Sequence, residues 1–193
     1  YLRAMAIRPI LEVPDPRLKT VSTPVTEFDD ELRTLVEDMF DTMYDAPGIG
    51  LAAIQVGVPK RVLVIDLQEP DPDAEPEVCN HGGHEHTHQP VKRDPRIFIN
   101  PEILDPSDDL SVYQEGCLSV PEQFADVERP ATIRARWQDL DGNVHEEEMD
   151  GLWATCLQHE MDHLEGILFI DHLSRLKRQM VLKKLNKMRK EAA

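Results

Sequence analysis

The sequence has few cysteines, no long apolar run and little positive charge, and each shortage excludes a class of protein. Its 193 residues include three cysteines, widely spaced, which argues against a disulfide framework and for a reducing compartment. No apolar run reaches the roughly 18 residues that a transmembrane helix needs. The net charge of −16 disfavours a general nucleic-acid-binding protein, and nothing in the sequence suggests sequence-specific recognition of nucleic acid.

The amino terminus also lacks the pattern of a secretory signal, in which a basic segment precedes a sustained apolar core. We therefore expect a cytoplasmic protein with no membrane partner. The chain is 40% hydrophobic and 30% charged, which is ordinary for a soluble protein. At this length we expect one domain over residues 1–193, large enough for its own core and without internal repeats.

Charge is distributed unevenly along the chain. Residues 171–193 contain eight basic and two acidic side chains, a net charge of +6 within a chain of −16. We expect a basic C-terminal helix at about residues 173–190, with Leu176, Met180, Leu182, Leu185 and Met188 available for packing. On charge alone, a solvated helix face explains this segment.

A helix-borne metal motif stands at residues 158–166, Gln-His-Glu-Met-Asp-His-Leu-Glu-Gly. Two histidines four positions apart, His159 and His163, lie one turn apart on the same face of a helix, about 6 Å along the axis. That spacing lets two imidazoles bind one metal ion, and Glu160 can then accept a proton from an attacking water. An ordinary helix with two half-buried histidines is the alternative, because short motifs produce false positives.

A catalytic metal site usually has three protein ligands and one open position, so a third ligand is needed. Phe169 stands where one group of zinc proteases has a third histidine. Cys156 lies seven residues from His163, about 10.5 Å of helix rise, and is better interpreted as a packed core thiol. The third ligand is therefore expected upstream, where Cys117 follows Gly116; a small buried apolar residue is the other interpretation of that cysteine.

Three short motifs occur in order along the chain. They are Gly-Ile-Gly-Leu-Ala-Ala-Ile-Gln at 48–55, Glu-Gly-Cys-Leu-Ser at 115–119 and Gln-His-Glu-Met-Asp-His-Leu at 158–164. Together they resemble the signature of the peptide deformylases, from about residue 7 to the C-terminus apart from one insertion. The resemblance implies a metal-dependent hydrolase that removes the formyl group from the N-terminal methionine of newly synthesised proteins and releases formate.

The resemblance also assigns roles to particular residues. Glu160 accepts a proton and returns it to the leaving amine, while the side-chain amide of Gln55 and the backbone N–H of Leu118 stabilise the oxyanion. The implied metal ligands are Cys117, His159 and His163. The implied methionine pocket and substrate-backbone contacts are Ile49, Gly50, Tyr113, Gly116, Leu152, Cys156 and His159.

Further features follow from the same resemblance. An ion pair between Glu115 and Arg129 is expected to steady the Cys117 loop. Phe124 departs from some relatives, which have an arginine near the substrate entrance, so the preference for residues after methionine is open. The basic C-terminal helix is implied to dock on the ribosome.

The sequence does not specify which metal ion is bound. A Cys/His₂ ligand set suits zinc. The resemblance implies Fe(II) in the cell, with zinc, nickel or cobalt as alternatives in a purified sample.

Two other functions compete with this interpretation. A generic zinc endopeptidase would cut inside unformylated peptides, although a downstream third ligand is missing. A metal-binding or metal-storage protein would depend on the His-rich stretch at residues 79–88 instead of on Glu160.

The expected fold is α+β, with small, mostly antiparallel sheets around a central metal-bearing helix at about 151–165 capped by Asp150. Apolar periodicity predicts another helix at about 29–44. Residues 7–25 are expected to be extended segments and turns. The expected strands are 61–67, 96–100 and 110–113, with a hairpin formed by 132–139 and 144–149.

The composition changes at about residues 69–96. This segment contains five prolines, many acids, Cys79 and four of the eight histidines. It has too few apolar residues to pack, so we expect a long surface loop or flexible insertion. A metal site in its Cys/His-rich tract is the alternative.

Overall fold

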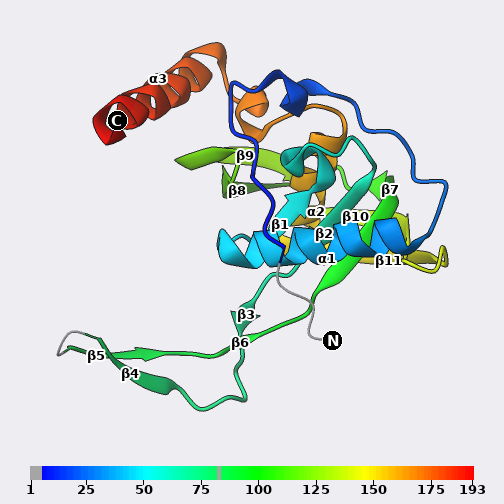
Figure 1. Cartoon of the computed structure of the whole chain (residues 1–193), viewed down its shortest axis with the longest axis horizontal. Helices are drawn as coiled ribbons and strands as arrows, with labels where there is room; N and C mark the ends of the chain where they lie inside the picture. Colours follow the sequence, from blue (N-terminus) through cyan, green and yellow to red (C-terminus); the bar gives the residue numbers. More distant parts are fainter. Residues whose placement is uncertain (1–5, 82–83) are drawn as a thin grey trace.

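A computed structural model describes residues 6–81 and 84–193 and has the predicted α+β architecture (Figure 1). Residues 1–5 and 82–83, which include the start of the predicted domain and the middle of the His-rich stretch, lie outside the described residues. The helices are α1 (Asp30–Asp45), α2 (Gly151–Leu164) and α3 (Arg175–Ala192), with 3-10 turns η1 (Pro16–Lys19), η2 (Ala53–Val56) and η3 (Phe169–His172). None of the described helices is long and apolar enough to cross a membrane.

The main sheet has five antiparallel strands in the order β1-β2-β7-β10-β11. These strands are β1 (Gly50–Ala52), β2 (Val62–Ile65), β7 (Arg96–Pro106), β10 (Thr132–Gln138) and β11 (Val144–Asp150). The predicted hairpin is confirmed as β10–β11, and the Asp141-Gly142 turn places Gly142 at a φ of 80°, which favours glycine. The predicted strand 96–100 exists but continues to Pro106.

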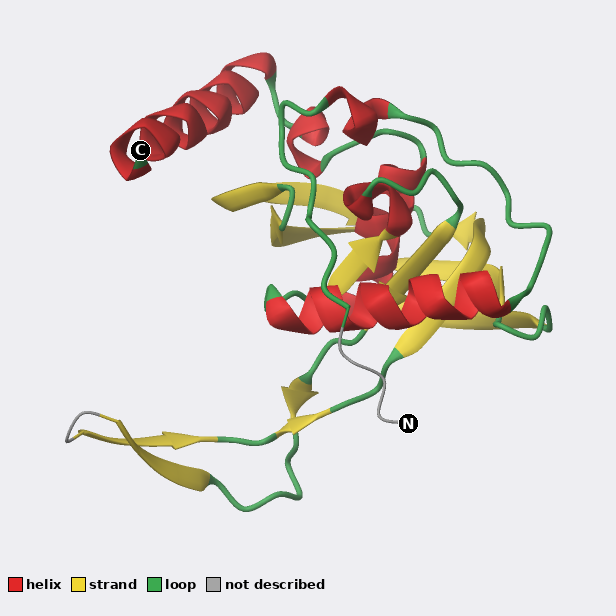
Figure 2. Ribbon diagram, viewed as in Figure 1, coloured by secondary structure: helices red, strands yellow, loops and turns green. Residues whose placement is uncertain are grey.

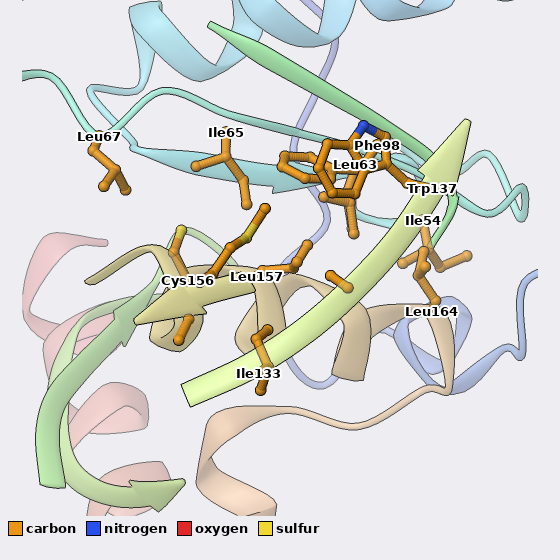
Figure 3. Close-up of a cluster of buried hydrophobic side chains, with 14 residues drawn as sticks. Ile54, Leu63, Ile65, Leu67, Phe98, Ile133, Trp137, Cys156, Leu157 and Leu164 are labelled. Carbon is orange, nitrogen blue, oxygen red and sulfur yellow. The ribbon is translucent and has the colours of Figure 1, made fainter. Parts of the chain in front are cut away.

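Helices cover the two faces of this sheet, as Figure 2 shows. Every residue of β2 is fully buried. Because successive strand residues face opposite sides, Val62 and Val64 pack in the cluster that contains α1, while Leu63 and Ile65 pack with α2. Figure 3 shows Leu63 and Ile65 across from Leu157 of α2. The sequence-predicted central helix is therefore enclosed, and it carries the metal motif into the core.

Helix α2 begins at the predicted N-cap residue, Asp150, but the side chain of Asp150 makes no cap hydrogen bond. In α1, by contrast, the Asp29 side chain accepts a hydrogen bond from the backbone N–H of Leu32. The position of α2 therefore comes from the burial of its residues, which is nearly continuous from Ala154 to Glu160.

A separate two-stranded ribbon, β8–β9, lies beside the main sheet. It consists of β8 (Leu110–Cys117) and β9 (Val120–Pro130). The expected strand 110–113 extends to Cys117, and β9 was not expected at all. Val120 and Val127 of β9 pack with η3 and with Leu185 of α3.

Helix α3 confirms the predicted C-terminal helix, and Ser174 caps it by accepting a hydrogen bond from the Lys177 N–H. The predicted packing was wrong for two residues. Leu185 is buried, but Leu176 and Met180 are 68% and 63% exposed, because only one side of α3 meets the ribbon.

The segment at 69–96 contains strands where a long surface loop or flexible insertion was expected. They form two antiparallel pairs, β3 (Glu69–Pro70) with β6 (Val91–Lys92), and β4 (Glu77–His81) with β5 (His84–His88). The described residues are thus partly paired as ribbons, and an insertion at 69–96 stays a prediction. We call the described residues 69–81 and 84–92 the arm; it projects away from the main sheet and the helices (Figures 1 and 2).

One buried carboxylate holds the base of the arm. Asp66, which is fully buried, accepts hydrogen bonds through Oδ1 from the backbone N–H groups of Gln68 and Asp94, both at 3.1 Å. Its Oδ2 accepts a hydrogen bond of 2.6 Å from the Tyr44 hydroxyl. The two chain segments at the base of the arm are therefore fixed to one residue.

Candidate metal centre and active site

The structure brings together the three residues that the sequence suggested as metal ligands. His159 and His163 lie on α2, and Cys117 lies at the end of β8. One ligand atom of each lies within 4.8 Å of the others, and Cys117 Sγ is 3.3 Å from His163 Nε2. Ligands of one tetrahedral ion are about 3.5–4 Å apart when each bond is about 2.0–2.3 Å. The donor set therefore fits a single transition-metal ion.

Two glycines permit this convergence of elements. A Cβ atom on Gly50 would lie 2.5 Å from Glu160 Oε1, so glycine lets β1 approach the α2 carboxylate. A Cβ atom on Gly116 would lie 2.5 Å from the Phe124 ring. The register of β8–β9 shifts between Gly116 and Cys117, which allows the thiol to leave the regular strand pairing.

Glu160 has the environment of a general base. It is buried, and its Oε2 has no hydrogen-bond partner among the residues that the structure describes. Burial raises its pKa to about 7, although the neighbouring His159 opposes this shift. A carboxylate with a pKa near neutrality can both accept and return a proton. An unpaired buried carboxylate oxygen beside three ligand-type residues is also an observation that fits a bound cation.

The two histidines have opposite electrostatic environments. Burial lowers the pKa of His163, and His159 lowers it further. Burial alone would lower the pKa of His159 as well, but hydrogen bonding to Cys117 and Glu115 raises it well above the ordinary value. Because metals bind neutral imidazole, the lowered pKa of His163 suits a metal ligand.

Gln55 is oriented by its surroundings. Its side-chain oxygen accepts a hydrogen bond of 2.9 Å from the Ala52 N–H, and its Nε2 donates to Ser119 Oγ at 3.0 Å. The same nitrogen is 3.5 Å from Cys117 Sγ. The side-chain amide nitrogen of Gln55 therefore faces the cluster of Cys117, His159 and His163. Ser119 was missed by sequence reasoning, although it lies within the second motif.

A buried ion network joins three elements of the site. Arg129 of β9 donates to both oxygens of Glu115 on β8, at 2.8 and 3.1 Å, and to Asp162 Oδ2 on α2 at 2.8 Å. Burial would raise the pKa of Glu115, but hydrogen bonds with His159 and Arg129 lower it. Glu115 Oε1 is 3.6 Å from His159 Nδ1. The network thus holds the Cys117 strand against the histidine helix.

Asp162 was also missed by sequence reasoning. Its side chain accepts hydrogen bonds from Arg129 and His172. Asp162 lies between His159 and His163 in the sequence, and this position within the metal motif could have indicated a role in the site.

A cavity of about 480 Å³ opens onto this cluster. It is lined by residues of the α1–β1 loop, β8, β9 and α2, and Glu160 and His159 lie at its wall. Cys156 is 5% exposed and packs in the core, as its interpretation as a core thiol predicted. Every residue predicted to form the methionine pocket or backbone contacts lines the cavity: Ile49, Gly50, Tyr113, Gly116, Leu152, Cys156 and His159. Gln55, Glu115, Cys117 and Leu118 line it too.

Phe124 lines the same cavity and is 63% exposed. It stands opposite Gly116 in the β8–β9 ribbon. Phe124 therefore adds an exposed apolar surface to the cavity wall.

A Cys/His₂ cluster and an unpaired buried carboxylate beside a largely apolar pocket define a metal-dependent hydrolase. Residues 7–179 match the family model of the polypeptide deformylases. A peptide deformylase from Novosphingobium aromaticivorans is 80% identical over 188 residues, which cover 97% of this chain and 100% of that protein.

Solved structures agree with this match. A peptide deformylase from Legionella pneumophila is 42% identical and has a TM-score of 0.81, covering 97% of this chain and 98% of that chain. A peptide deformylase from Ehrlichia chaffeensis in complex with actinonin is 39% identical and has a TM-score of 0.80, covering 95% of this chain and 98% of that chain. The chain belongs to the polypeptide deformylase family. It is a metal-dependent hydrolase that removes the formyl group from nascent peptides, which confirms the activity implied by the three motifs.

Proposed function

We propose that the chain removes the formyl group from an N-terminal methionine with Glu160 as the general base and then the general acid. Cys117, His159 and His163 lie beside Glu160 and would hold the metal ion. The observation that carries this proposal is the unpaired, buried Oε2 atom of Glu160 next to the ligand cluster. A structural carboxylate at such a position would have its hydrogen bonds satisfied. A base must instead keep an oxygen free for a substrate water.

The proposed reaction is hydrolysis of a formamide. A metal ion bound by the three ligands would polarise the formyl carbonyl and activate water for attack. Glu160 accepts a proton from the attacking water as the new C–O bond forms, and it delivers that proton to the amine nitrogen as the C–N bond breaks. The amide of Gln55 and the backbone N–H of Leu118 donate to the developing oxyanion. Formate and a peptide with a free amine are the products.

Substrate recognition follows from the cavity. Ile49 and Leu152, with the Cys156 thiol, offer apolar surface to the methionine side chain, and Tyr113 forms part of the same wall. The backbones of Gly50 and Gly116 would hold the peptide chain. Arg129 and Glu115 position the Cys117 strand through their buried ion pair.

We propose Fe(II) as the ion in the cell, with zinc, nickel or cobalt as replacements in purified protein. The Cys/His₂ donor set accepts each of these ions. Metal analysis of protein purified without oxygen, followed by formate release after reconstitution with each ion separately, tests this assignment. Higher activity with zinc than with iron would contradict it.

We also propose that the protein acts in the cytoplasm and docks on the ribosome through α3. Basic residues concentrate on α3, and Leu176 and Met180 add exposed apolar surface. A solvated basic face is the alternative. The measurement is co-sedimentation with ribosomes before and after the changes K183E/K184E/K187E, and equal co-sedimentation would exclude docking through these lysines.

Formate release from a formyl-Met tripeptide tests the proposed function. The same peptide without the formyl group and longer peptides with blocked ends serve as comparisons. We expect formate from the formylated peptide and no cleavage of internal peptide bonds. Cleavage inside unformylated peptides without formate release would favour a generic zinc endopeptidase instead.

A further inference from the structure

One wall of the cavity is a short loop of backbone, and the chain at the base of the arm holds it. Residues 46–50, which join α1 to β1, line the cavity. The Ile49 carbonyl oxygen accepts a hydrogen bond of 2.9 Å from the Asp66 N–H, which continues the pairing of β1 with β2. The Gly48 carbonyl oxygen accepts a hydrogen bond of 3.0 Å from Nε2 of Gln68. A side chain therefore holds the loop where strand pairing has ended.

Gln68 makes this contact from an unusual backbone conformation. Its φ is 51°, in the left-handed region that residues with a Cβ atom rarely adopt. Asp66 Oδ1 accepts a hydrogen bond of 3.1 Å from the Gln68 N–H, and the preceding Leu67 is buried in the same core cluster as Ile65 (Figure 3). Strained residues of this kind concentrate at functional sites, which motivates a functional interpretation of Gln68.

The loop that Gln68 holds is in close contact with groups of the proposed reaction. A Cβ atom on Gly48 would lie 2.7 Å from Leu118 Cδ1, and a Cβ atom on Gly50 would lie 2.5 Å from Glu160 Oε1. Leu118 is the proposed oxyanion donor, and Glu160 is the proposed general base. A shift of the loop would therefore change the space that a substrate has between these two groups.

We propose that Gln68 is a positioning residue of the deformylase. Its side-chain amide holds the Gly48 carbonyl and thereby fixes the wall formed by Ile49 and Gly50. Gln68 is not one of the described residues that line the cavity, so it acts through the loop and not on the substrate. This inference rests on the proposed function, in which Ile49 contacts the methionine side chain and Gly50 holds the peptide backbone.

Loss of this hydrogen bond should affect substrate binding more than the chemical step. The wall faces parts of the substrate that do not react, and an interaction made equally in the ground state and the transition state changes KM and not kcat. In Gln68→Met the side chain keeps its length but cannot donate. We expect the KM for a formyl-Met tripeptide to rise by about 2–10-fold, the range of one net hydrogen bond. The preference for formyl-Met over formyl-Ala tripeptides should fall as well, because the wall contacts the side chain.

Formate release by the metal-loaded full chain, measured with both tripeptides, gives KM and kcat for each variant. Gln89→Met is the matched control, because Nε2 of Gln89 donates to the carbonyl oxygens of Asp71 and Ala74 within the arm. It loses the same kind of hydrogen bond away from the cavity and should keep the wild-type KM. A role of Gln68 in folding alone would lower the apparent kcat for both tripeptides equally and leave each KM unchanged, and this result would overturn the proposal.

A second variant ensures that the test does not depend on the fold of Gln68→Met. Gln68→Gly also removes the amide, but glycine adopts a φ of 51° without strain, and its KM should rise in the same way. An unchanged KM in both Gln68 variants, beside active wild-type protein, would overturn the role of Gln68 and leave the proposed function intact. No formate release by the wild type from either tripeptide would instead overturn the proposed function, and this inference with it.

Discussion

Two of the two-stranded ribbons that the described residues form outside the main sheet, β8–β9 and β4–β5, each carry a cysteine. The β8–β9 ribbon bears Cys117 and is clamped to α2 by the buried Arg129 network. The β4–β5 ribbon bears Cys79 and belongs to the arm, whose base is fixed at Asp66. The two ribbons have the same secondary structure but different surroundings. The β8–β9 ribbon is held from several sides, whereas the arm is held at its base.

This difference shows what makes a ligand-type residue into a catalytic ligand. Packing and the Arg129 network hold Cys117 in place before any metal binds. The same enclosed centre contains the unpaired Glu160 oxygen that can accept a proton. In the arm, the hydrogen bonds to Asp66 hold the base and the pairing of β4 with β5 sets the backbone register beyond it. A preorganised centre supports catalysis, and the arm has no such support from several sides. The following predictions test this contrast.

Replacing Glu160 with Gln should have the largest effect on activity. The amide cannot accept the proton, and general acid–base catalysis is worth about 10²–10⁴-fold. We expect formate release to fall by at least that factor while the zinc or iron content at the centre is unchanged. Substantial activity in the variant would show that another group is the base.

Removing the Cys117 thiol should remove the ion at the centre and, with it, formate release. Metal analysis of Cys117→Ala is the measurement, and Cys156→Ala is the matched control. Cys156 is buried in the core, and burial raises the pKa of its thiol well above the ordinary value, so it remains protonated and does not bind metal. Full occupancy of the centre in Cys117→Ala would remove that residue from the ligand set.

Replacing Arg129 with Met should destabilise the clamped ribbon. Glu115 would remain buried without its partner, and removal of one partner from a buried pair costs about 3–5 kcal/mol. Urea unfolding gives the loss, and the control is Arg134→Met. Arg134 pairs with Glu146 at the surface, at 3.5 Å, where such pairs contribute about 0–1 kcal/mol. Equal losses for the two variants would show that the network does not hold the ribbon.

The hydrogen bond between Tyr44 and Asp66 at the base of the arm should make a smaller contribution to stability, and this contribution should depend on pH. Burial and the hydrogen bond to Asp66 raise the pKa of Tyr44 to about 12, compared with about 10 in the unfolded chain. Its contribution is fully present below pH 10 and is lost as the pH rises toward 12, because the unfolded chain ionises first. Alkaline unfolding of Tyr44→Phe compared with the wild type measures this contribution. An identical pH dependence in the two proteins would contradict it.

Removing the end of the arm should have the smallest effect on the deformylase. A short Gly-Ser linker in place of residues 77–88 leaves the Asp66 contacts intact. We expect unchanged formate release and a stability change within about 0.5 kcal/mol, as for surface changes. Loss of formate release in this variant would show that the end of the arm contributes to the deformylase site.

Sequence patterns predicted the elements whose residues have one strong period. The apolar stripe of α1, the continuous apolar run of β2 and the Asp141-Gly142 hairpin each specify their structure locally. The metal motif was equally clear, because histidines four apart on a helix share a face. The residues of the candidate centre came from three motifs that recur together, and not from periodicity.

Other features depend on contacts that no local pattern contains. Strand β9 has a proline near each end, several acids and no clean apolar alternation, and pairing with β8 determines its structure. Asp162 and Ser119 have roles through partners distant in sequence, Arg129 and Gln55. Leu176 fits an apolar stripe, yet it is exposed, since periodicity predicts a face and not what covers it. The single catalytic domain over 1–193 stays a prediction.

The most direct test of the preorganised centre is X-ray absorption at the zinc edge of the zinc-loaded variant in which a Gly-Ser linker replaces residues 77–88. Without the Cys- and His-rich residues 79–88, the spectrum reports the ion at the α2 cluster. The predicted result is one sulfur ligand at about 2.3 Å and two imidazole nitrogens at about 2.0–2.1 Å, with the sulfur lost when Cys117 is also replaced by Ser. A shell of nitrogen and oxygen without sulfur would contradict the assignment of Cys117, His159 and His163 as the metal centre.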